Sequence, residues 1–241
     1  MTGHIRVEQV TKCRIIRTMN RKNMLRIAAF GIVCVLLGAN AMPAIAKERM
    51  VVQGNHLIYD LSPSSGLPEA EQTILPEDHI LLAGLLMEHP EVDTVVVSGG
   101  GGVSWPAHEM ASKIEVFGLN TIAKKTCSSA CTTILLAGRE RSMHKGSRLG
   151  FHRTSNSADH LREVYSSLRG DVGWKDEFAF ANYIFEQGQV TARSYIESLV
   201  RRGVNAEFAL RVLTYGSNDM WYPSEEELLE SGVLTRPPRP E

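Results

Sequence analysis

The chain has 241 residues, and its 26 Lys and Arg residues against 27 Asp and Glu residues give a formal net charge of −1. The charges are unevenly distributed, because residues 47–241 hold 19 of the basic and 26 of the acidic residues, a net charge of −7. This charge argues against a nucleic-acid partner and against a surface that binds anionic membranes. The same residues have the length of a single domain with a sizeable core.

Residues 1–46 have the features of a secretory signal peptide. Residues 1–26 contain seven basic residues and one acidic residue, and an apolar stretch follows at 27–39. An A-x-A pattern then ends at Ala46. We expect cleavage after Ala46, with translation starting at Met1, Met19 or Met24. The stretch is shorter than the roughly 20 residues of a membrane span. Cleavage predicts a periplasmic or secreted protein, and the alternative is an uncleaved signal anchor in the inner membrane.

Residues 47–235 alternate between strand and helix patterns, which is typical of an α/β domain. Gly54 and Asn55 suggest an opening strand or hairpin. The expected helices span 76–89, 107–117, 129–137, 179–186, 191–202, 205–213 and 225–230, and the expected strands span 92–97, 119–125 and 147–152. Gly188 and Gly203 are expected to end two of these helices. Residues 236–241, RPPRPE, have the composition of a disordered tail.

The most informative stretch is 126–154, TCSSACTTILLAGRERSMHKGSRLGFHRT. Ser128 is a plausible helix N-cap and Gly138 a plausible helix end, so Ser129 would open a short buried helix. Backbone N–H groups in the first turn of a helix are unpaired and can stabilise an oxyanion. His152, at the end of the following strand, could act as the base for Ser129. The alternative is that both serines only cap the helix and that His152 is a partly buried structural residue.

Four glycines, Gly99, Gly100, Gly101 and Gly102, follow the strand at 92–97 directly. Glycines allow close approach of the backbone to a ligand, although a plain flexible turn is the alternative. The loop has neither pattern of a phosphate-binding loop. Both this loop and Ser129 follow strands, at the edge where open α/β sheets bind their ligands.

Two cysteines, Cys127 and Cys131, flank Ser129. Placed four residues apart on one helix, their Cα atoms would be about 6 Å apart, which a disulfide tolerates. The alternatives are two buried thiols that pack the helix, or a thiol nucleophile. A zinc site is disfavoured because the spacing is not C-x-x-C and no second pair of ligands is evident.

The stretch from Ser129 to His152 resembles the proteolytic subunit of Clp protease and its exported relatives, which share the ClpP/crotonase-like spiral of strand-helix units. The matching features are a serine before a small residue, Ala137 and Gly138 at the helix end, and the string LGFH ending at His152. The resemblance implies that Ser129 is the nucleophile and His152 the base. It also implies an oxyanion hole made by the N–H groups of Gly101, or its neighbour Gly102, and Ala130.

A third catalytic residue is harder to assign. In the family, a carboxylate near the start of a later helix orients the histidine, which points to Asp176 here, with Glu177 and Asp171 as further choices. Each of these acids could instead be a solvated residue favoured by the helix dipole. Without a carboxylate, Ser129 and His152 would work as a dyad or be inactive.

The resemblance therefore predicts an exported serine hydrolase, a Clp-protease-like peptidase that cuts short or unfolded peptides. Its expected partners are a peptide or protein substrate and further copies of itself in a homo-oligomer, and it implies no metal and no organic cofactor. One alternative is an inactive binding or assembly module with the same fold. The other is a crotonase-like acyl-thioester enzyme, which an exported location disfavours.

Overall fold

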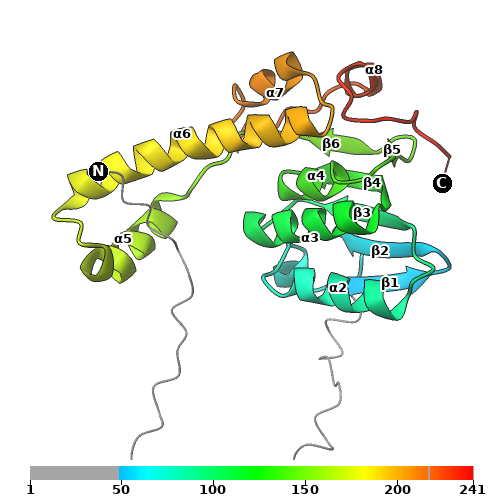
Figure 1. Ribbon diagram of the computed structural model, residues 1–241, viewed down its shortest axis with the longest axis horizontal. Coiled ribbons are helices and arrows are strands. Elements are labelled where there is room, and N and C mark those ends of the chain that lie inside the picture. Colours follow the sequence, from blue (N-terminus) through cyan, green and yellow to red (C-terminus); the bar gives the residue numbers. More distant parts are fainter. Residues whose placement is uncertain (1–48, 217, 241) are drawn as a thin grey trace, which may run out of the picture. The chain divides into compact units, whose positions relative to one another are not determined.

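The structure is a computed structural model that describes residues 49–216 and 218–240 (Figure 1). The chain divides into two units, Met1–Met42 and Pro43–Glu241, and all the described residues belong to the second. The predicted signal peptide and its cleavage site therefore lie outside the described residues. Within the two described ranges, none of the helices combines the length and the apolar character needed to cross a membrane.

A mixed sheet of six strands forms the centre of the described domain, in the order β1-β2-β3-β4-β5, with β6 paired to β4. The strands are β1 (Met50–Gln53), β2 (His56–Leu61), β3 (Thr94–Gly99), β4 (Asn120–Ser128), β5 (Arg141–Met143) and β6 (Arg148–Gly150). Strands β1 and β2 form the predicted antiparallel hairpin, and the other pairs are parallel. Strand β4 is long enough to pair with β5 along its first half and with β6 at its carboxyl end. This arrangement brings the end of β6 beside the end of β4.

The helices that follow the strands are α2 (Asp78–Glu88), α3 (Ser104–Phe117), α4 (Ala130–Leu135), α5 (Ala158–Val172), α6 (Glu177–Arg201), α7 (Ala206–Val212) and α8 (Glu225–Glu230), with a short 3-10 turn at Glu69–Glu71. Helix α3 packs between α2 and α4, beside the sheet (Figure 1). The α/β class predicted from the sequence is thus confirmed. Helix α8 has the predicted capping box, in which Ser224 and Glu227 each bond the backbone of the other.

Several elements differ from the sequence prediction. Strand β5 was not predicted, β4 is three residues longer at its end, and β6 is shorter than the expected 147–152. Helix α6 continues through Gly188, because one glycine costs a helix only about 1 kcal/mol and no proline follows it. Helix α5 was not predicted, although Leu161, Val164, Tyr165 and Leu168 recur along it at helical spacing. Helix α4 ends at Leu135 and begins one residue later than expected.

The described part of the predicted disordered tail, residues 236–240, makes backbone and side-chain contacts with the domain. Arg239 forms a parallel bridge with His144, and its backbone N–H donates to the carbonyl of Met143. The Arg236 guanidinium contacts the Glu140 carboxylate at 2.6 Å. Backbone pairing beside β5 therefore holds a segment whose composition alone indicates disorder.

Candidate active site

Ser129 occupies a sharp turn between β4 and α4. Its φ of 56° and ψ of −128° make it one of two non-glycine residues with positive φ in the described chain, the other being Lys125. The backbone is held on both sides, because the Ser129 N–H donates to the Gly150 carbonyl and the Ser129 carbonyl accepts from the N–H and hydroxyl of Thr132. Such strained strand-to-helix turns present a nucleophilic side chain at the end of a sheet. Ser129, not Ser128, is the N-cap of the helix.

His152 follows β6 and is fixed by its neighbours in the chain. Phe151 is fully buried and forms an antiparallel bridge with Trp221, with both backbone hydrogen bonds made. On the other side, the Arg153 N–H donates to the carbonyl of Tyr215. The backbone around the imidazole is therefore anchored on both sides, and the side chain points to the turn at Ser129.

The reacting pair predicted from the sequence is in hydrogen-bond contact. His152 Nε2 lies 2.7 Å from Ser129 Oγ, and His152 Nδ1 lies 2.7 Å from the carbonyl oxygen of Arg153. A carbonyl oxygen can only accept a hydrogen bond, so Nδ1 carries the proton and the Nε2 lone pair faces the serine hydroxyl. This is the tautomer that a general base needs.

Asp176 is not brought to His152, which corrects its proposed place as the third catalytic residue. Its carboxylate caps helix α6 by accepting from the Ala179 N–H at 2.9 Å. The part of α6 that borders the serine cavity is at Thr191 and Tyr195. At 1.5 Å per residue, Asp176 is about 22 Å along the helix from Thr191. Glu177 and Asp171, the other choices, adjoin the same distant end of α6.

The glycine loop lies directly against the turn at Ser129. Gly101 has φ of 102°, and a Cβ placed on it would lie 2.9 Å from both the Ala130 nitrogen and the Ser129 Cβ. The Gly101 carbonyl is turned toward Ile74, whose N–H donates to it at 2.9 Å. Because the peptide bond is trans, the N–H of Gly102 points to the opposite side.

This geometry favours Gly102 over Gly101 as an oxyanion donor. Gly102 and Ala130 both border the cavity that contains Ser129 and His152, whereas Gly101 does not. Among the described residues, no hydrogen bond engages the N–H of Gly102 or of Ala130. Two free donors beside the serine hydroxyl can hold a developing oxyanion.

Cys127 and Cys131 form a disulfide, with their Cα atoms 5.3 Å apart. The bridge does not join two turns of one helix, as the spacing suggested, because Cys127 is the penultimate residue of β4 and Cys131 is in the first turn of α4. It therefore spans the turn that presents Ser129. A disulfide leaves no free thiol at either position to act as a nucleophile.

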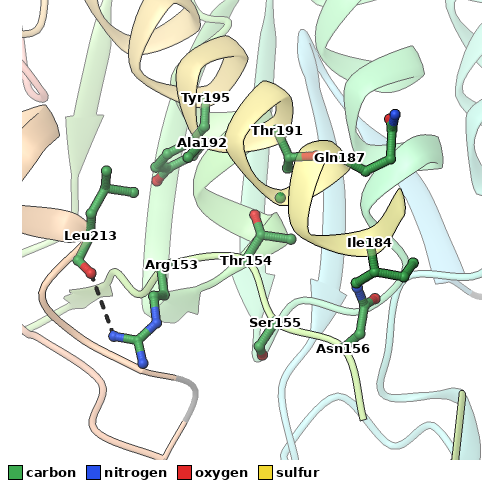
Figure 2. Close-up of a pocket in the computed structure, with 11 residues that line it drawn as sticks. Arg153, Thr154, Ser155, Asn156, Ile184, Gln187, Thr191, Ala192, Tyr195 and Leu213 are labelled. Carbon is green, nitrogen blue, oxygen red and sulfur yellow. Dashed lines mark hydrogen bonds between the residues drawn. The ribbon is translucent and has the colours of Figure 1, made fainter. Parts of the chain in front are cut away.

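Two cavities meet at the site. One, of about 210 Å³, contains Ser129 and His152 and is also bordered by His108. A second, of about 300 Å³, lies under α6 (Figure 2). Both are bordered by Thr154, Ser155, Thr191 and Tyr195. Burial raises the pKa of Tyr195 to about 12, so its hydroxyl stays protonated at neutral pH and can donate a hydrogen bond into the cavities.

The residues that complete these cavities carry no sequence motif. Tyr195 lies on a helix whose pattern indicates only an amphipathic scaffold, and the loop at 153–156 has no motif. Their proximity to Ser129 depends on the path of the chain between β6 and α6. In the part of the chain that the structure describes, no three His, Cys, Asp or Glu side chains gather as a metal site would require.

No protein-family model matches the chain, and no curated protein sequence matches it. Solved structures are similar to it. A point mutant of ClpP1 from Listeria monocytogenes is 15% identical, with a TM-score of 0.48 over 69% of this chain and 87% of that one. A putative enoyl-CoA hydratase from Streptomyces coelicolor A3(2) is 16% identical, with a TM-score of 0.45 over 84% and 70%. An enoyl-CoA hydratase from Polaromonas sp. JS666 is 17% identical, with a TM-score of 0.47 over 79% and 70%. These similarities assign no activity to this chain.

Proposed function

We propose that this protein is a serine hydrolase of the Clp-protease-like type, a peptidase in which Ser129 and His152 form a catalytic dyad. The observation that carries the proposal is the 2.7 Å contact between Ser129 Oγ and His152 Nε2, made in the tautomer that accepts a proton. A strained turn that exposes the hydroxyl and two free N–H groups beside it support the same chemistry.

In the proposed reaction, Ser129 Oγ attacks the carbonyl carbon of a peptide bond while His152 Nε2 takes the hydroxyl proton. The N–H groups of Gly102 and Ala130 bond the negative oxygen of the tetrahedral intermediate. His152 then gives its proton to the leaving amine, and an acyl-enzyme remains on Ser129. Water then attacks the acyl carbon while His152 Nε2 takes a proton from it. The ester bond breaks, His152 returns the proton to Ser129 Oγ, and the new carboxylate leaves.

The Arg153 carbonyl takes the orienting place that a carboxylate occupies in a triad. It fixes the ring and its tautomer, but it contributes a dipole and not a full negative charge to the imidazolium that forms. We therefore expect a slower enzyme than one with a Ser-His-Asp triad. An inactive module with the same fold is the rival proposal, and a test of covalent reactivity separates the two.

An alkyl fluorophosphonate probe provides that test, because it labels only an activated serine. We expect labelling of the folded protein to disappear in Ser129→Ala and to fall by at least about 100-fold in His152→Ala. Ser128→Ala is the matched control: this neighbouring serine is buried, its hydroxyl makes no hydrogen bond within the described chain, and the variant should label like the wild type. Absence of labelling in folded wild-type protein would favour the inactive module.

We also propose that the protein is exported and acts on short or unfolded peptides, because a location outside the cytosol would deprive it of an ATP-driven unfolding partner. The signal-like residues 1–46 support this location. Amino-terminal sequencing of the protein recovered from the cell envelope should begin at Lys47. A protein that starts at Met1, Met19 or Met24 and remains in the membrane would instead indicate the uncleaved anchor.

Self-association is part of the same proposal. Three apolar side chains of α6, Phe178, Phe185 and Val190, are 84%, 67% and 57% exposed, which is unusual for a helix that faces only water. Light scattering coupled to gel filtration should give a mass above that of one chain. A Phe178→Ser, Phe185→Ser double variant should have a lower mass than the wild type. A wild-type protein with the mass of one chain would contradict self-association.

A further inference from the structure

The larger cavity under α6 adjoins the cavity of the serine. Four residues, Thr154, Ser155, Thr191 and Tyr195, border both this cavity and that of Ser129. Figure 2 shows these four among the residues of the larger cavity. A substrate bound at the serine therefore has space nearby for one side chain. The volume of the larger cavity, about 300 Å³, is ample for an amino-acid side chain. The residues of this cavity therefore decide which substrates fit next to the reacting bond.

The larger cavity is bordered by a basic residue, although the chain is acidic. Residues 47–241 have a net charge of −7, yet no Asp or Glu borders either cavity. The larger one is bordered by Arg153, by the polar residues Asn156 and Gln187, and by the apolar residues Ile184, Ala192 and Leu213. A basic group beside neutral donors and an apolar wall is the environment that binds an anion.

Arg153 is available for such a ligand. Its NH1 atom reaches the carbonyl oxygens of Leu213 and Thr214 only at 3.5 and 3.4 Å, near the outer limit of a hydrogen bond. Within residues 49–216 and 218–240, no carboxylate pairs with its guanidinium. Its backbone is nevertheless fixed, because its N–H donates to Tyr215 and its carbonyl accepts from His152.

The position of Arg153 in the chain links recognition to catalysis. The residue directly follows His152, and its carbonyl holds the ring that takes the serine proton. Its backbone carbonyl thus holds the His152 ring, and its side chain borders the adjacent cavity. A guanidinium offers a planar pair of donors that matches a carboxylate, which neutral donors alone do not.

We propose that the cavity under α6 is a substrate subsite for a carboxylate, and that Arg153 is the residue that determines this specificity. The inference rests on the proposed function only in calling the bound peptide a substrate, because a peptide can bind at the subsite without being cleaved. The carboxylate can belong to a Glu or Asp side chain or to the carboxyl terminus of a peptide. These two sources share one chemistry and are separated by the choice of peptides.

The test measures binding of three short peptides to the Ser129→Ala variant by isothermal titration calorimetry. The peptides are acetyl-Ala-Ala-Glu-amide, its Gln counterpart, and acetyl-Ala-Ala-Ala with a free carboxyl terminus. We expect at least one carboxylate peptide to bind about tenfold more tightly than the Gln amide, a preference that weakens at high salt. Tighter binding of the Glu peptide would show that the subsite takes a side-chain carboxylate. Tighter binding of the peptide with the free carboxyl terminus would show that it takes a chain terminus.

Variants at two arginines show whether Arg153 is responsible. Arg153→Gln in the same background should abolish the preference, and Arg153→Lys should retain part of it, because a lysine keeps the charge without the planar pair of donors. Arg148→Gln is the matched control: it removes the same charge from an arginine that lies over the Tyr222 ring and borders neither cavity. Circular dichroism verifies that each variant is folded.

Equal binding of all three peptides would overturn the inference, and so would a carboxylate preference that Arg153→Gln leaves unchanged. Neither result depends on fluorophosphonate labelling. The proposed hydrolase can therefore fail while the carboxylate subsite stands, and the reverse holds as well.

Discussion

The disulfide between Cys127 and Cys131 closes a short loop around Ser129, joining the end of β4 to the first turn of α4. The enclosed serine has the strained backbone of the turn, with φ of 56°. A covalent bridge across the turn opposes its relaxation to an unstrained conformation. The bridge therefore stabilises both the fold and the geometry of the candidate nucleophile.

Removal of this bridge should weaken the protein and its reactivity together. For a closed loop of about five residues, we expect the Cys127→Ala, Cys131→Ala double variant to lose about 2 kcal/mol in free energy of unfolding. Labelling by fluorophosphonate should fall by about tenfold, because relaxing the strained turn moves Ser129 from His152. Denaturant titration and labelling rates measure the two effects. Wild-type protein treated with a reductant should behave like the variant, and full labelling after reduction would show that the bridge does not support the turn.

The close approach of Gly101 to the serine turn predicts that no larger residue is tolerated there. An alanine would have its Cβ 2.9 Å from the Ala130 nitrogen at a φ of 102°. We expect Gly101→Ala to displace the glycine loop and lower the labelling rate by at least about 100-fold, the loss seen when an oxyanion donor is removed. Gly100→Ala is the control, since a Cβ at Gly100 meets nothing within 4 Å. Similar labelling rates for the two variants would contradict the assigned position of the loop.

The place of Asp176 at the start of α6 predicts a structural role for it. Asp176→Ala should cost about 1 kcal/mol in free energy of unfolding through loss of the helix cap. Ser224→Ala removes the cap of α8 and should cost a similar amount. Both variants should label with fluorophosphonate at wild-type rates, because neither residue contacts His152. A large loss of labelling confined to Asp176→Ala would restore the carboxylate as a catalytic residue.

Ser129 and His152 could be predicted from the sequence, because local patterns surround both. Ser129 lies at the junction of β4 and α4, and His152 lies two residues after β6, the strand that pairs with the end of β4, so short sequence patterns find both. The orienting group could not be found this way, because it is a backbone carbonyl and carries no sequence signal. Asp176 caps α6, and the length of this unbroken helix places it away from His152.

The elements of the fold that have strong local sequence signals could also be predicted. The hairpin, the buried strand β3 and the capped helix α8 follow from periodicity, turn residues and caps. Helix α6 crosses Gly188, which suggested a helix end, and helix α5 was missed although its apolar residues have helical spacing. Arg153 and Tyr195 are 42 positions apart in sequence but border one cavity, a proximity that only the folded path of the chain reveals.

The bulge of β4 before the serine turn is held by an ion pair. Val97 pairs with Ala123 but Gly99 pairs with Cys127, so β4 has extra residues around Lys125, whose φ is 57°. The Lys125 ammonium donates to the Asp60 carboxylate at 2.8 Å. Burial raises the pKa of Asp60, but hydrogen bonds from Lys125 and two serines lower it more, and the resulting pKa is about 2.

Asp60 should therefore stabilise the fold in a pH-dependent way. Because its pKa is lower in the folded chain than in the unfolded one, its contribution is present above about pH 4 and is lost as the pH falls toward 2. We expect Asp60→Asn to reduce the free energy of unfolding at pH 7 by about 1 kcal/mol, after allowance for solvent screening of a partly exposed pair. The difference from the wild type should shrink in denaturant titrations at successively lower pH. Asp159→Asn, which breaks an exposed pair with Arg162, is the control and should change stability little at any pH. A difference for Asp60→Asn that stays constant from pH 7 to pH 3 would show that its charge does not hold the bulge.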